Sequence, residues 1–170
     1  MNIRIIGAVL IILGCGGVGF AIAASYHKEE RTLRQLLNAL DYMQCELQYH
    51  RTPLPELCRQ VAAADKGILK KVFFSLTTEL EDQISPDVER CMAHVLSSCK
   101  ELPQLVGEAL ELLGQSLGRF DIEGQLKGLE WVRSECRRGI ENLEQNEILR
   151  NRSYQTLGLC AGAALAILFI

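Results

Sequence analysis

Proline, aromatic residues and net charge are all scarce in this chain of 170 residues. Proline occurs four times, aromatic side chains make up 6% of the residues, and no run of β-branched residues appears outside the two termini. A chain with few helix breakers and few typical strand residues favours an all-α fold. The formal net charge is only −3, which argues against the strongly basic surface of a nucleic-acid-binding protein. We therefore expect no nucleic-acid partner.

Charged residues are absent from long stretches near both ends of the chain. Residues 5–24 read IIGAVLIILGCGGVGFAIAA, and a helix of this length spans about 30 Å, the thickness of a bilayer's hydrocarbon core. Residues 156–170 read TLGLCAGAALAILFI, a shorter run that tilt or local thinning of the bilayer would accommodate. We predict an N-terminal transmembrane helix within residues 1–26 and a C-terminal one over 156–170, with the lipid bilayer as a partner.

Three other interpretations of the N-terminal run stay open. First, the run could be a cleaved signal peptide, because IAA before Ser25 resembles a cleavage site. Second, ILGC at residues 12–15 loosely resembles a lipoprotein signal. Third, the run could be a buried core helix. A retained span is favoured, because the run is longer than the apolar core of a typical signal and has no polar face.

Basic residues and cysteines predict on which side of the membrane the central region lies. Arg4 alone lies on the outer side of the two spans, whereas five basic residues flank their inner sides: Lys28, Arg31, Arg34, Arg150 and Arg152. An excess of basic flanking residues is typical of the cytoplasmic side. The cysteines between the spans have no regular spacing, so we expect free thiols in a reducing compartment and no disulfide framework.

The region between the spans, residues 27–155, is predicted to form one helical domain. Every charged residue except Arg4 lies in it, 17 basic against 21 acidic. Apolar residues recur at helical spacing in roughly six segments. Three of these segments are expected to open with a proline, at Thr52-Pro53, Ser85-Pro86 and Pro103, and Asp121 is expected to cap the sixth helix.

The first and last of these helices carry the clearest apolar faces. The first face consists of Leu33, Leu36, Leu37, Leu40, Met43 and Leu47, and the last follows a heptad spacing at Ile122, Leu126, Leu129, Cys136, Ile140 and Leu143. Such seams are typical of helices packed side by side in bundles. We predict an antiparallel pair, with the last helix running unbroken into residues 156–170. The predicted fold is all-α, a six-helix bundle flanked by two transmembrane helices.

Glycine is concentrated in the segment LELLGQSLGRFDIEGQLKGLEW, residues 110–131. A phosphate-binding loop would need lysine and then serine or threonine directly after its glycines, but Gly114 and Gly118 are followed by Gln115 and Arg119. We expect instead close helix packing at Gly114 and a left-handed helix C-cap at Gly118. If Gly128 lies on an exposed face, alanine there should be neutral or mildly stabilising.

The pattern L-G-x-S-L-G-x-x-D-x-x-x-Q, together with an earlier T-P-L, resembles the signature of the stage III sporulation protein AB family. The residues that carry it are Thr52, Pro53, Leu54, Leu113, Gly114, Ser116, Leu117, Gly118, Asp121 and Gln125. The resemblance implies a helical domain similar to the platform domain of type II secretion and type IV pilus proteins. It also implies a location in the mother-cell membrane around the forespore. The implied partners are a cytosolic ATPase, stage III sporulation protein AA, and other membrane proteins of a secretion-like complex.

No residue pattern indicates an enzyme, a cofactor or a metal. Cys91 and His94 lie three residues apart on a predicted helix, but a metal site needs more ligands. Two functions are therefore weighed. The first is a non-enzymatic platform that recruits an ATPase through the motif residues, and the second is a membrane-tethered structural or adhesion protein whose helical domain faces outward. The basic flanks and the cysteines favour the first.

Overall fold

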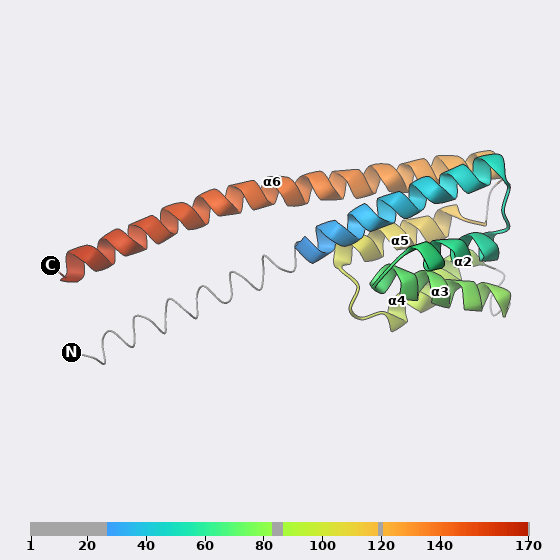
Figure 1. The fold of residues 1–170 in the computed structure, drawn as a ribbon, viewed down its shortest axis with the longest axis horizontal. Coiled ribbons are helices and arrows are strands. Elements are labelled where there is room, and N and C mark those ends of the chain that lie inside the picture. The colour runs from blue at the N-terminus through green and yellow to red at the C-terminus, as the bar shows by residue number, and fades with distance from the viewer. Residues whose placement is uncertain (1–26, 83–86, 119–120, 170) are drawn as a thin grey trace.

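The computed structural model describes residues 27–82, 87–118 and 121–169, and for 147–169 it describes the backbone. Helices are the only regular elements in these ranges, which contain no strand (Figure 1). The first helix covers residues 27–49 of the described chain. It is followed by α2 (Leu54–Ala64), α3 (Ile68–Glu81), α4 (Val88–Ser98), α5 (Gln104–Ser116) and α6 (Ile122–Phe169). The predicted all-α fold is confirmed.

The first helix and α6 form a long antiparallel pair, as predicted (Figure 1). Two ion pairs give the register: Arg34 Nη2 lies 2.5 Å from Glu144 Oε1, and Arg133 Nε lies 2.9 Å from Asp41 Oδ1. The residue numbers rise along one helix as they fall along the other, so the helices run in opposite directions. The chain therefore enters the first helix at the same end of the domain at which α6 leaves it.

Helix α6 is continuous over 48 residues, from Ile122 to Phe169. The prediction that the sixth helix runs on into the C-terminal apolar segment is confirmed. Among the helices that the structure describes, none is both long enough and apolar enough to cross a membrane. The span predicted within residues 1–26 lies outside the described residues.

The core lies between the helix pair and the four shorter helices, which pack along one side of it (Figure 1). Most predicted seam residues are buried, and Val132, which the heptad spacing did not include, is fully buried as well. Ile122 departs from the prediction, because it is the first residue of α6 and is 37% exposed. The largest fully buried side chains are Phe73, Leu33, Leu36, Leu40, Met43, Leu57, Leu69, Leu76, Met92, Leu110, Leu113 and Leu117.

The helix starts agree with the predictions in part. Asp121 caps α6 as predicted, since its Oδ1 accepts a hydrogen bond from the amide of Gly124 at 3.0 Å. Thr52 does not cap α2: Pro53 occupies the N-cap position, and no side chain caps that helix. Helix α4 is capped by Asp87, whereas the start predicted at residues 85–86 falls outside the described ranges.

Candidate partner-binding surface

The two sequence motifs, about sixty residues apart in the chain, meet at one end of the bundle. Residues 52–54 connect the first helix to α2, and residues 113–118 end α5. A Cβ placed on Gly118 would lie 3.9 Å from Leu54 Cδ2, so the motifs are in contact. Asp121 and Gln125 begin α6 next to them. We call this region the motif end, and in Figure 1 it is the end remote from both chain termini.

Gly114 and Gly118 are required by the close approach of α4 to α5. A Cβ on Gly114 would lie 2.7 Å from Met92 Cβ, and one on Gly118 would lie 2.5 Å from Val88 Cγ2. Gly118 also has a φ of +78°, directly after the helix C-cap. Both predictions, close packing at Gly114 and a left-handed cap at Gly118, are confirmed.

Gly128 does not lie on an open face, so the condition under which alanine would be tolerated there is not met. A Cβ there would lie 2.5 Å from Ser116 Cβ, so Gly128 is the point at which α6 crosses the end of α5 and does not belong to an open face. Ser116 is buried, and its hydroxyl donates to the backbone oxygen of Leu112 at 2.9 Å. Ser116 and the fully buried Leu117 therefore have structural roles within the motif end.

The turn before α2 contains a residue whose conformation the sequence analysis missed. Arg51 has a φ of +51°, which makes it the only non-glycine residue with a positive φ in the described part of the chain. The next residue, Thr52, donates from its hydroxyl to Glu46 Oε2 at 2.8 Å and so ties the turn to the first helix. No local pattern signals the strain at Arg51, because glycine or asparagine is the usual choice for such a position.

The exposed part of the motif end carries side chains of both charges, and its cations include Arg51 and Lys127. Pro53 and Asp121 are exposed, whereas Gln125 is half-buried. Two further acidic side chains are exposed in this region, Glu123 in the first turn of α6 and Asp82 at the end of α3. Glu123 pairs with Lys127 at 2.8 Å, whereas Asp82 and Asp121 form no ion pair within the described residues. These two carboxylates favour a partner that brings basic groups to them.

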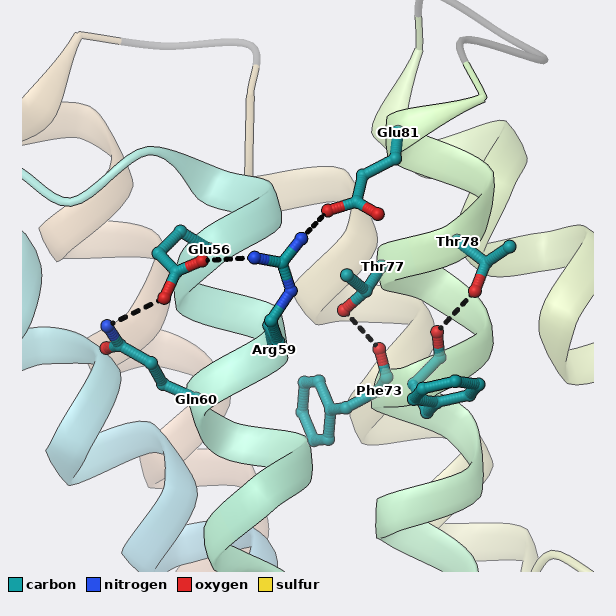
Figure 2. Close-up of polar contacts among 8 residues, drawn as sticks. Glu56, Arg59, Gln60, Phe73, Thr77, Thr78 and Glu81 are labelled. Atoms are coloured by element: carbon teal, nitrogen blue, oxygen red, sulfur yellow. Dashed lines mark hydrogen bonds and ion pairs between the residues drawn. The ribbon is translucent and has the colours of Figure 1, made fainter.

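Ion pairs on the side of the bundle link α2 to α3 (Figure 2). Arg59 Nη1 lies 2.7 Å from Glu56 Oε2, and its other terminal nitrogen contacts Glu81. All three side chains are more than one-third exposed. Exposed pairs of this kind contribute little to stability, so we regard them as surface features and not as a site.

The candidate metal pair does not converge. Cys91 is buried, whereas His94 is exposed and its Nδ1 lies 2.6 Å from Glu79 Oε1. In the described residues, no group of three or more histidine, cysteine or acidic side chains could hold a metal ion.

Two buried cysteines have raised pKa values. Burial raises the pKa of Cys58 to about 12. Burial is also the largest cause that raises the pKa of Cys136 to about 11. Those two thiols are therefore inert at neutral pH, and Cys45 is an exposed free thiol.

These features define an all-helical bundle built on a long antiparallel helix pair, with two contacting sequence motifs at its far end. The chain belongs to the stage III sporulation protein AB family, which matches residues 4–170. A curated relative, stage III sporulation protein AB of Bacillus subtilis, is 25% identical over 171 residues and covers 99% of each chain. The resemblance inferred from the motifs is confirmed, and membership of the family implies a role in sporulation.

A solved structure of a stage III sporulation protein AB has the same fold. It superposes with a TM-score of 0.64 at 22% sequence identity, and the match covers 72% of this chain and 98% of that one. The family description names a sporulation protein and no enzyme.

Proposed function

We propose that this chain is a non-enzymatic membrane platform of a secretion-like sporulation complex. In this proposal it couples a cytosolic ATPase, stage III sporulation protein AA, to other membrane proteins during endospore formation. Residues 1–26 and 156–170 hold it in the mother-cell membrane around the forespore, and residues 27–155 face the cytoplasm. The observation that carries the proposal is the meeting of the two family motifs at the end remote from the termini (Figure 1).

The antiparallel pair supports this arrangement. The uncharged run at residues 5–24 precedes the first helix at one end of the domain, and the motif end lies at the other. The first helix, residues 27–49, separates these ends by about 35 Å at 1.5 Å per residue. A soluble ATPase can therefore reach the motif end without approaching the bilayer.

The chemistry of the motif end supports a division of labour among its residues. Gly114, Ser116 and Leu117 are buried and shape the packing. Asp82 and Asp121 are exposed and project charge into the solvent. Charge complementarity sets association rate and specificity more than affinity, which suits docking of a partner that binds and releases repeatedly.

Co-purification of the ATPase with charge-removal variants tests the proposal. The test variant combines Asp82→Asn with Asp121→Asn, and asparagine keeps the cap of α6. The control combines Glu111→Gln with Glu130→Gln, which removes the same charge from exposed positions on α5 and α6 outside the motif end. We expect the test variant to retain roughly tenfold less ATPase than the control. A tenfold loss corresponds to the loss of about one close charge pair across the interface. Equal retention by both would place docking elsewhere.

Thiol labelling separates the platform from the outward-facing adhesion protein. Cys45 is exposed, whereas Cys58, Cys91 and Cys136 are buried, so Cys45 reports the side on which the domain lies. In growing cells that express the chain, a membrane-impermeant maleimide should label Cys45 only after permeabilisation. Labelling in intact cells would support the adhesion alternative and refute the cytoplasmic platform.

A further inference from the structure

Basic side chains gather at the end of the bundle opposite the motif end. Two contacts place them there. The amide of Leu105 donates to Glu29 Oε1 at 2.9 Å and places the start of α5 beside the start of the first helix. A short connection joins α3 (to Glu81) and α4 (from Val88), and the contact of His94 with Glu79 lies near the end of α3, as in an antiparallel pair. The start of α3 therefore lies level with the connection that follows α4 (Figure 1).

We call this region the basic end. It consists of six exposed cations from three separate segments, namely Lys28, Arg31, Lys66, Lys70, Lys71 and Lys100. Two of them, Lys66 and Lys70, flank the uncapped start of α3, where the helix dipole adds further positive potential.

The cations of the basic end form no ion pairs in the described residues, although Glu101 lies beside Lys100 and Asp65 precedes Lys66. Cations elsewhere in the described chain do form ion pairs: Arg34 pairs with Glu30, and Lys127 pairs with Glu123. The acidic neighbour Glu29 is already engaged by the amide of Leu105. A domain with more acidic than basic residues thus carries an end face on which six exposed cations form no ion pair within the described chain.

We infer that the basic end is a docking surface for the anionic headgroups of the bilayer in which the chain is anchored. The inference rests on the membrane anchoring in the proposed function. The run of residues 5–24 leads into the first helix at this end, and α6 continues beyond it to Phe169. A surface held this close to the bilayer meets its headgroups at high effective concentration. Each lysine near an anionic membrane surface strengthens binding about fivefold.

Docking on the bilayer would restrain the domain against the membrane. The motif end would then be presented at a defined height and angle above the membrane. An acidic protein is the other class of partner for such a face. The bilayer is favoured because the six cations come from three separate segments of an end face next to the anchor, and only two of them, Lys28 and Lys100, line the hollow beside residues 101–104.

A lysine footprint on the full chain in nanodiscs tests the inference. Discs of neutral phosphatidylcholine are compared with discs that also contain phosphatidylglycerol, and acetylation of each lysine is followed by mass spectrometry. In anionic discs we expect acetylation of Lys70, Lys71 and Lys100 to slow about threefold or more and to recover in high salt. Lys127, at the motif end, is the internal control and should react equally in both discs. If each of the four lysines were acetylated at the same rate in neutral and in anionic discs, the inference would be overturned.

Matched variants keep the test independent of folding. The triple substitution Lys66→Gln, Lys70→Gln and Lys71→Gln should remove most of the salt-sensitive protection at Lys100. The control variant combines Arg51→Gln, Arg90→Gln and Arg137→Gln. It also removes three exposed cations that form no ion pair within the described chain. The control should keep the protection, and a loss of protection in both variants would refute a specific role for the basic end.

The same preparation separates failure of the inference from failure of the proposed function. A chain that co-elutes with both kinds of disc but shows no lipid-dependent footprint is anchored, and the docking inference alone is wrong. A chain that co-elutes with neither overturns the anchoring and the inference together.

Discussion

Replacing Gly118 by alanine should destabilise the bundle through two separate effects. The φ of +78° belongs to the left-handed region, where a residue with a Cβ costs about 1–2 kcal/mol. The new Cβ would also lie 2.5 Å from Val88 Cγ2, and relieving such overpacking costs about 1–3 kcal/mol. We expect the free energy of unfolding to fall by about 2–5 kcal/mol in total, because the new Cβ clashes both with its own backbone and with Val88.

A double-mutant cycle separates the two effects. Val88→Ala removes the methyl group that the new Cβ would strike, but it leaves φ of residue 118 unchanged. In urea unfolding of residues 27–152, followed by far-ultraviolet circular dichroism, the double variant should recover about 1–2 kcal/mol relative to the sum of the single variants. Strict additivity would refute the contact with Val88. A Gly118→Ala variant as stable as the parent would refute both the contact and the left-handed cap.

Three further changes test other positions of the described chain. Gly128→Ala should lower the free energy of unfolding by about 1 kcal/mol, since overpacking against Ser116 outweighs the gain in helix propensity; a higher melting temperature would contradict the close crossing. Arg51→Gly should raise the free energy of unfolding by about 0.5–1 kcal/mol by removing a strained φ of +51°, and a lower urea midpoint would argue against that conformation. Burial raises the pKa of Asp65, so the folded state binds more protons and its stability falls as pH rises through the interval between the unfolded and folded pKa values. Asp65→Asn should therefore raise the melting temperature at neutral pH and lose that advantage below about pH 4, whereas an equal shift at both pH values would exclude titration of Asp65 as the cause.

The helices were predictable because their signals are local. Apolar spacing and the positions of breakers lie within a few residues of each other, and the seam of the first helix from Leu33 to Leu47 is buried as expected. The conformation at Gly118 was predictable for the same reason, since a glycine between two helical patterns is a common C-cap.

Features that depend on distant residues could not be read from the sequence. Thr52 bonds to Glu46 and does not cap α2, because a carboxylate of the first helix is within reach of the turn. Gly128 is confined by Ser116 of another helix, and helical periodicity does not show which turn a neighbour crosses. Each motif was visible in the sequence, but their contact through Leu54 and Gly118 required the fold.

The unbroken length of α6 has a mechanical consequence. At 1.5 Å per residue, its 48 residues form a lever about 72 Å long. Its N-terminal turn belongs to the motif end, and its other end lies far beyond the bundle (Figure 1). A rotation of about 10° imposed at the motif end would displace a rod of this length by about 12 Å at its C-terminal tip. Small angular changes at one end of the molecule are thereby converted into movements larger than the diameter of a helix.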